Sequence, residues 1–271
     1  MRKRLDDKVA IVTGAGSSDE GVGTGDAAAI LFAREGARVV LVDSSPERAK
    51  RTHGVIAAEG GEAMTVTADV TVASDCERVV STVLDAYGQL DILDNNIGVG
   101  IRGDVVSVNE SDWDFIMAIN VKSIMLMSKY AVPAMLMSKY AVPAIERSET
   151  GAIINISSIA TRRPSHITPY SASKGAVEAL TRAMATDHGG QGIRVNCIAP
   201  GFLATPRGTH LDPKMRERRR EVPVVNHEGN AWDVAYGAVY LASDEAAYVS
   251  GIVLQIDGGA SVRGFDLSST T

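Results

Sequence analysis

The sequence predicts an α/β protein in which about seven parallel strands form one doubly wound sheet flanked by helices. Short Val- and Ile-rich runs alternate with longer helical patterns along the 271 residues. The runs are uniformly apolar rather than alternating, which is typical of parallel strands buried on both faces. No shift in composition marks a linker, so we expect a single domain over residues 1–271, with loose tails at 1–6 and 262–271.

The order of the elements supports this fold class. Seven segments are predicted to be strands: 9–14, 37–43, 62–69, 90–96, 151–158, 192–200 and 251–259. Helical patterns occupy residues 23–35, 45–59, 72–87, about 112–145, 170–189 and 230–243. Strands and helices that alternate in this way form βαβ units, and such units build a parallel sheet with helices on both faces.

Composition favours an intracellular protein and gives no sign of nucleic acid or a membrane as a partner. The formal charge of −6 gives no electrostatic reason to expect nucleic acid or an anionic membrane as a partner. Cys76 and Cys197 lack the spacing of metal ligands, so no metal site is predicted, and so few cysteines indicate reduced thiols. The N-terminus does not have the pattern of a signal peptide, and no apolar run is long enough to span a membrane. We therefore expect a cytoplasmic protein.

A perfect tandem repeat interrupts the pattern. The decapeptide MLMSKYAVPA occurs at 125–134 and again at 135–144, which indicates a duplication event rather than a solenoid repeat. In a continuous helix, ten extra residues add about 15 Å and rotate the far end by about 1000°, roughly 80° short of three whole turns. Pro133 opposes continuation because it lacks an N–H group, at a cost of about 3 kcal/mol. We expect copy one to stay docked and copy two to project beyond the helix end; the alternative loops out copy one and docks copy two.

A glycine-rich loop, Thr13 to Gly23, follows the first strand and opens the first helix. Glycines there permit a tight turn and the close approach of a pyrophosphate, which then lies at the helix N-terminus. Asp43 ends the second strand, where its carboxylate would accept a hydrogen bond from a ribose 2′-hydroxyl and repel a 2′-phosphate. The loop predicts a Rossmann-type dinucleotide site, and Asp43 favours NAD over NADP.

Tyr170 and Lys174 are four residues apart and therefore lie on the same face of a predicted helix. A lysine ammonium stabilises a phenolate and lowers the pKa of a phenol from its usual value of about 10. Such a tyrosine could exchange a proton with an alcohol or carbonyl oxygen near neutral pH. Ser157, at the end of the strand 151–158, would hold the reacting oxygen beside it. These residues predict an alcohol/ketone redox site.

Together these features resemble the short-chain dehydrogenase/reductase family over nearly the whole chain. The matching motifs, in the family's order, are the glycine-rich loop, Asp69-Val70, Asn95-Asn96-Ile97-Gly98, Asn120, Ser157, Tyr170 with Lys174, and Pro200-Gly201. The resemblance implies a single Rossmann-type domain, a nicotinamide cofactor, hydride transfer at hydroxyl- or carbonyl-bearing carbons, and usually a tetramer.

The resemblance also implies roles for individual residues. Tyr170 would be the general acid/base, Ser157 would orient the substrate oxygen, and Lys174 would tune Tyr170 and bind the nicotinamide ribose. Asn120 would hold a water in the proton relay. The implied cofactor-binding residues are Gly14, Ser17, Gly21, Val22, Gly23, Asp43, Asp69, Val70, Asn96, Gly98, Tyr170, Lys174, Pro200, Gly201 and Thr205. Asp69 and Val70 would flank the adenine, and Asn95 would contact the adenosine-side ribose or the adjoining backbone.

Three departures from the family pattern bear on the site. The glycine-rich loop has three more residues between Gly14 and Gly21 than the commonest pattern, which leaves the partner of each phosphate open. Ile97 replaces a usual alanine near the cofactor floor. Asn120 and Ser157 are 37 residues apart, ten more than usual, because the repeat lies between them. The position of Asn120 is therefore the least secure part of the predicted relay.

The leading hypothesis is an NAD-dependent alcohol dehydrogenase or carbonyl reductase acting on a small secondary alcohol or ketone. We expect a homo-oligomer, dimer or tetramer, whose interface the repeat alters. The alternatives are an NADP-dependent 3-ketoacyl-type reductase and a non-catalytic cofactor-binding module disabled by the duplication. Arg216, Arg218, Arg219 and Arg220 in the expected substrate loop could meet an anionic substrate, but neighbouring glutamates favour a solvated helix face.

Overall fold

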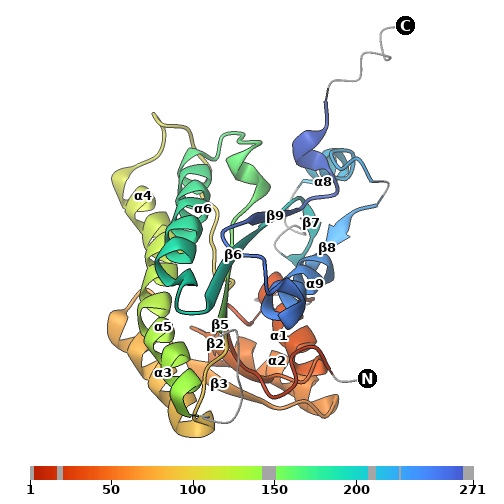
Figure 1. Ribbon diagram of the computed structural model, residues 1–271. Helices are drawn as coiled ribbons and strands as arrows, with labels where there is room; N and C mark the ends of the chain where they lie inside the picture. The colour runs from red at the N-terminus through yellow and green to blue at the C-terminus, as the bar shows by residue number, and fades with distance from the viewer. Residues whose placement is uncertain (1–2, 17–20, 142–150, 207–211, 226, 265–271) are drawn as a thin grey trace, which may run out of the picture.

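The seven predicted strands form one parallel sheet in a computed structural model of the chain, in the order β3-β2-β1-β4-β5-β6-β9 (Figure 1). The structure describes residues 3–16, 21–141, 151–206, 212–225 and 227–264. The strands are β1 (Val9–Thr13), β2 (Arg38–Asp43), β3 (Ala63–Thr67), β4 (Ile92–Asn95), β5 (Gly151–Ile156), β6 (Ile193–Pro200) and β9 (Val253–Ile256), while β7 (Leu203–Ala204) and β8 (Gly229–Asn230) pair separately. The predicted fold class is confirmed. Because β1 lies between β2 and β4, the strand order reverses there, which is where doubly wound sheets bind ligands.

Helices cover both faces of the sheet (Figure 1). They are α1 (Thr24–Arg34), α2 (Pro46–Ala58), α3 (Ala73–Tyr87), α4 (Glu110–Met117), α5 (Ser123–Ala141), α6 (Thr168–Gly189), α8 (Pro213–Arg220) and α9 (Ala231–Ala242). One apolar cluster joins α1, α2 and α9 to the sheet, and a second joins α3, α5 and α6 to its other face. The run of small side chains from Ala27 to Ala29 is fully buried, which lets α1 pack closely on the sheet.

The segment that carries Asn120 is a π-helical turn, Ala118–Lys122, between α4 and α5. A π turn holds one more residue than an α turn and is common at functional sites. The stretch Glu110–Ser138 is long and apolar enough to cross a membrane by length and composition alone, but half of its most apolar window is buried inside the fold. We therefore interpret it as a core helix.

The predicted N-terminal tail is anchored within its described part. Leu5 is fully buried in the core, and the Arg4 guanidinium donates two hydrogen bonds to Glu245, at 2.9 and 2.6 Å. The expectation of a loose segment over 1–6 is therefore wrong for residues 3–6, because a buried leucine fixes the chain. At the other end, residues 265–271 lie outside the described part.

The repeat is taken up by α5, which continues through Pro133 into copy two as far as Ala141. Copy one is docked as expected, but the expectation that copy two lies wholly beyond the helix end is wrong. Met135 is fully buried beside Gly151, and the Ser138 hydroxyl accepts a hydrogen bond from the Leu90 amide at 2.9 Å. These core contacts offset the cost of the proline. Residues 142–144 of copy two lie outside the described part.

Identical sequence therefore occupies opposite environments in the two copies. In copy one Met125 is 42% exposed and Met127 fully buried, whereas in copy two Met135 is fully buried and Met137 is 63% exposed. The rotation of a ten-residue step, about 80° short of whole turns, moves each side chain to a different part of the helix surface. The position of each methionine around the helix axis, rather than its chemistry, therefore decides whether it enters the core.

We predict that Met135→Ala lowers the free energy of unfolding by about 2–5 kcal/mol, because it leaves a cavity in the core. Met137→Ala should change it by no more than about 0.5 kcal/mol, since that side chain is largely in solvent. Urea unfolding followed by circular dichroism measures both. Equal losses of unfolding free energy in the two variants would contradict the packing of Met135 in the core.

Candidate active site

A cavity of about 540 Å³ opens at the carboxyl ends of the central strands. Its wall combines Gly14 after β1, Gly98 after β4, Ser158 after β5 and Gly201 after β6 with residues of α6. Segments far apart in the sequence meet here because parallel strands bring their carboxyl ends to one edge of the sheet. The cavity therefore lies where the fold is expected to bind a ligand.

Lys174 is the central charged group of this cavity. Its side chain is buried, its Nζ donates a hydrogen bond of 2.7 Å to the Ile156 carbonyl, and Nζ lies 5.9 Å from the centroid of the Tyr170 ring. A Cβ atom placed on Gly98 would come within 2.9 Å of Nζ and 3.6 Å of the Asn120 Oδ1. Glycine at 98 therefore leaves the space in which Lys174 and Asn120 approach each other.

The Asn120 amide is held rigidly in the π turn. Its Nδ2 donates to the Val99 carbonyl at 3.0 Å and to the Ser173 Oγ at 2.9 Å, while Oδ1 accepts from the Val99 N–H at 2.8 Å. Ser173 in turn donates to the Tyr170 carbonyl at 2.8 Å, which links the amide to the helix that carries the tyrosine. Asn120 precedes the repeat, and α5 takes up the extra residues at its far end. The duplication therefore leaves Asn120 beside Lys174.

Ser157 points toward α6. Its hydroxyl hydrogen-bonds the Lys174 carbonyl at 3.2 Å and the Glu178 carboxylate at 3.0 Å, and the residue is 2% exposed. Asn155, two residues earlier, also contacts α6, through a hydrogen bond of 3.0 Å to Thr181. Side chains two apart on a strand share a face, so Asn155 and Ser157 are both turned to the helix. Ser157 lines the cavity, but these bonds engage the hydroxyl hydrogen that we expected to hold the substrate oxygen.

Ser158, which the sequence reasoning missed, is a second hydroxyl on the cavity wall. It is partly exposed, and its Oγ accepts a hydrogen bond of 3.2 Å from the Ala160 N–H. No acceptor for its hydroxyl hydrogen lies among the described residues, so the hydrogen can be donated into the cavity. Counting the alternation of side chains from Asn155 would have separated Ser158 from Ser157.

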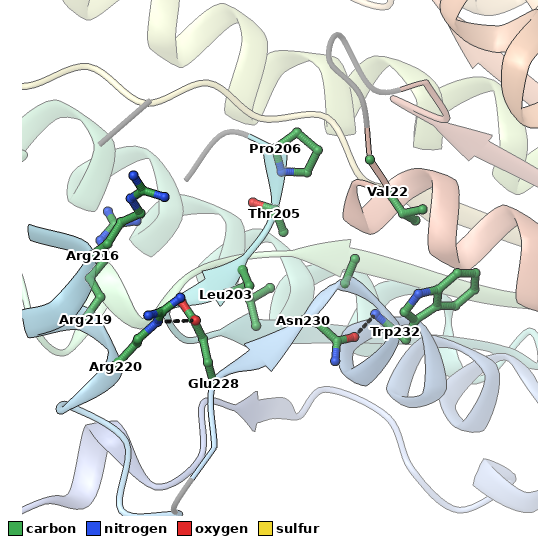
Figure 2. A pocket seen from close by; sticks show the side chains of 13 residues that line it. Val22, Leu203, Thr205, Pro206, Arg216, Arg219, Arg220, Glu228, Asn230 and Trp232 are labelled. Carbon is green, nitrogen blue, oxygen red and sulfur yellow. Dashed lines mark hydrogen bonds and ion pairs between the residues drawn. The ribbon is translucent and has the colours of Figure 1, made fainter. Parts of the chain in front are cut away.

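Most of the residues predicted to bind a cofactor line the cavity. They are Gly14, Gly23, Asn96, Gly98, Tyr170, Lys174, Pro200, Gly201 and Thr205. Gly14 has a φ of +65°, and the Asn96 Oδ1 accepts a hydrogen bond of 2.7 Å from Thr24, which joins the glycine-rich loop to the turn after β4. Gly21 and Val22 line a neighbouring cavity of about 440 Å³ (Figure 2). Ser17 lies outside the described residues.

Other predicted residues lie away from the cavity wall. The Asp69 carboxylate accepts hydrogen bonds from the Thr71 N–H and hydroxyl at 2.9 and 2.7 Å, and Val70 is buried in the core. Asn95 donates to Asn155 at 2.9 Å within the sheet. Asp43 is buried at the end of β2, where its Oδ1 accepts from the Ser45 N–H at 2.9 Å. Ile97 packs against the Gly14 turn rather than lining the cavity.

Burial shifts several titratable groups around the site. Asp94 lies beneath Asn96, and burial raises the pKa of its carboxyl to about 7. Burial also raises the pKa of the Cys76 thiol to about 11 and that of Cys197 to about 12, so both thiols stay protonated and unreactive near neutral pH. No cluster of metal-ligating side chains occurs among the residues that the structure describes.

A cavity at the reversal point of a doubly wound sheet, with a tyrosine and a buried lysine one helical turn apart on its wall, defines a dinucleotide-dependent oxidoreductase. The chain belongs to the short-chain dehydrogenase/reductase family. The pattern of a protein family described as enoyl-(acyl carrier protein) reductase matches residues 18–261.

Individual relatives cover nearly the whole chain. A 2,5-dichloro-2,5-cyclohexadiene-1,4-diol dehydrogenase from Sphingobium indicum is 36% identical over 97% of this chain and 99% of its own. A 3-oxoacyl-[acyl-carrier-protein] reductase from Thermotoga maritima is 36% identical over 94% of this chain and 98% of its own. A crystal structure described as that of a short-chain dehydrogenase/reductase from Burkholderia xenovorans superposes on this chain with a TM-score of 0.89. The two sequences are 34% identical, and the superposition covers 97% of this chain and 100% of the other.

The two serines can be distinguished by substitution. We predict that Ser158→Ala lowers kcat/KM by about a hundredfold, as is typical when a hydrogen-bond donor to a reacting oxygen is lost. Ser157→Ala should lower kcat/KM less than about tenfold and cost about 1 kcal/mol of stability, since that hydroxyl bonds α6. Steady-state kinetics and urea unfolding of both variants provide the measurement. A larger kinetic loss in Ser157→Ala would overturn this assignment.

Proposed function

We propose that the protein transfers a hydride between NAD(H) and a secondary alcohol or ketone, with Tyr170 as the general acid/base. The observation that carries the proposal is the buried Lys174 ammonium, which lies between the Ile156 carbonyl and the Tyr170 ring on the cavity wall. A cation fixed in that position stabilises a tyrosinate by charge. The pair thus has the character that proton exchange with an alcohol requires.

The residues present fit a nicotinamide dinucleotide. Gly23, Thr24 and Gly25, at the N-terminus of α1, line the cavity, so the positive end of the helix dipole would face a pyrophosphate bound there, although the Gly23 N–H is itself bonded to Asp26. The bound nicotinamide would supply or accept the hydride. Lys174 and Tyr170 would bind its ribose, and Pro200, Gly201 and Thr205 would line the nicotinamide end.

The protein's own groups would then manage the oxygen of the substrate. Tyr170 donates a proton to that oxygen during reduction and removes one during oxidation. Ser158, whose hydroxyl can donate to the cavity, would orient the same oxygen. Asn120, bonded to Val99 and Ser173, would fix the backbone beside Lys174. Holding the reacting groups in this arrangement supplies much of the rate enhancement that such enzymes need.

NAD is the proposed cofactor because of the charge at the end of β2. Asp43 is buried there with one carboxylate oxygen bonded to Ser45, and it lies close enough to Asp26 to interact with that carboxyl electrostatically. Two neighbouring acids disfavour the 2′-phosphate of NADP. Two cations oppose these acids: Arg48, beside Gly16 on the cavity wall, and Arg51, whose charge acts on Asp26. They keep the NADP-dependent 3-ketoacyl-type reductase as the alternative.

We further propose that the protein is a cytoplasmic homo-oligomer. Trp113 and Phe115 on α4, and Met125 on α5, are 38%, 53% and 42% exposed in the single chain. Apolar side chains exposed on adjoining helices favour association with another copy. The reading as a non-catalytic module is disfavoured by the close approach of Asn120 and Lys174 at Gly98.

Tyr170→Phe is expected to reduce kcat by at least about a thousandfold, because it removes the only atom proposed to exchange the substrate proton. NADH binding, followed by the fluorescence of the bound dinucleotide, should change by no more than about threefold. Turnover of a panel of secondary alcohols and ketones, monitored at the NADH absorbance band, measures the effect. Retained turnover would refute the role of Tyr170.

The cofactor preference is tested at Asp43. Wild-type protein should use NADH with a kcat/KM at least about tenfold above that for NADPH, and Asp43→Ala should bring the two values within about threefold. Asp69→Ala is the matched control, since its carboxylate is bonded to Thr71 and should leave the ratio unchanged. A wild-type preference for NADPH would favour the alternative reductase.

A further inference from the structure

We infer that the substrate carries an oxyanion, most simply a carboxylate, which Arg102 and Arg219 bind at the mouth of the cavity. The inference rests on the proposed redox function and names the substrate class of the same site. It arises from the charge of the cavity wall, and from two guanidinium groups there that make no hydrogen bond or ion pair with the described residues.

The cavity wall is strongly cationic although the chain as a whole is acidic. Its charged lining residues are Arg48, Arg102, Arg163, Lys174, Arg219 and one acid, Asp26. The Asp26 carboxylate is already bonded to the Gly23 N–H at 2.9 Å, as part of the helix cap. In a protein with a formal charge of −6, such an excess of cations on one concave surface favours an anionic ligand.

Three of the five cations have another explanation. Lys174 belongs to the catalytic pair, and Arg48 packs beside Gly16 at the glycine-rich loop, where a dinucleotide phosphate or adenosine would lie. The Arg163 guanidinium donates a hydrogen bond of 2.8 Å to the Ala260 carbonyl. For the side chains of Arg102 and Arg219, by contrast, no hydrogen bond or ion pair is found within the described part of the chain.

Both remaining arginines line the same cavity as Tyr170. Arg102 precedes Gly103, which pairs with Ile167 three residues before Tyr170. The Arg219 guanidinium stacks over the Phe202 ring at 5.1 Å from its centroid, next to the Pro200-Gly201 turn. The two side chains therefore come from different walls of the cavity that Tyr170 also lines, and Arg219 additionally borders the neighbouring cavity lined by Gly21 and Val22.

The two guanidinium groups are close enough to repel each other. Desolvation lowers the pKa of Arg219, the positive charge of Arg102 lowers it further, and the negative charge of Glu228 acts in the opposite direction. Arg220 on the same helix is instead paired with Glu228 at 2.8 Å (Figure 2). An oxyanion between Arg102 and Arg219 would remove this repulsion and supply the planar acceptor that a guanidinium fork binds best.

This assignment corrects the expectation that the arginines of α8 form only a solvated face. Arg218 fits that expectation, since it is exposed and lines neither cavity. Arg219 is only partly exposed and lines both cavities. The expected substrates are therefore hydroxy acids and oxo acids, in which the reacting oxygen and the carboxylate lie at different positions of a short chain.

The test compares ketone substrates that differ in the charge and chemistry of one terminal group. Purified protein with NADH is assayed with 4-oxopentanoate and 5-oxohexanoate, with their methyl esters, and with the corresponding sulfonates and phosphate esters. We expect acids to exceed esters in kcat/KM by at least about tenfold, with a KM for the acids that rises with salt. Arg102→Gln and Arg219→Gln should lower kcat/KM for the acids about ten- to hundredfold, mainly through KM, and change the esters less than about twofold.

Arg218→Gln is the matched control and should leave every substrate unchanged. If esters react as well as acids, or if the arginine variants lose both alike, the subsite is wrong while the redox function stands. If nothing in the panel reacts, binding of 4-oxopentanoate and its amide to the NADH complex is measured by fluorescence. Selective carboxylate binding that Arg219→Gln abolishes would support the subsite alone, and equal or absent binding would overturn it.

Discussion

The structure depends on the burial of one positive charge, the ammonium of Lys174. A buried cation is costly unless fixed dipoles replace its water, and here the Ile156 carbonyl at 2.7 Å does so. This contact sets the end of β5 against α6, and the approach of Asn120 requires both the π turn and a glycine at 98. The position of the Lys174 ammonium therefore constrains the end of β5, the register of α6 and the backbone at Gly98.

The same constraint explains why a ten-residue insertion is compatible with the site. Asn120 is fixed to Val99 and Ser173 by its own hydrogen bonds before the repeat begins, and β5 is fixed by its neighbours in the sheet. The added length can only be taken up at the distal end of α5, where Met135 and Ser138 find new contacts. Because the ten extra residues follow Asn120 and lie at the far end of α5, they leave the residues around Lys174 in place.

The sequence was sufficient for the sheet, because apolar runs are local signals. The glycine-rich loop and the spacing of Tyr170 and Lys174 are local signals too, and Gly14, Tyr170 and Lys174 line one cavity, while their roles stay predictions. The sequence failed where orientation matters. Ser157 and Ser158 are adjacent and chemically identical, so only the side-chain alternation of β5 separates them. The role of Arg219 depends on α8 being packed against Phe202, and the passage of α5 through Pro133 depends on core contacts that no local pattern encodes.

The repeat also has an evolutionary consequence. Two identical adjacent segments can be reduced to one by in-frame recombination, which joins Ala134 directly to Ile145. Isoleucine would then follow the Pro-Ala pair at the point where the longer chain has its buried Met135, so an apolar side chain would enter the same place in the core. The insertion is therefore reversible at the level of the gene. Selection can also act on the second copy alone, because the residues of the second copy contact different neighbours from those of the first copy.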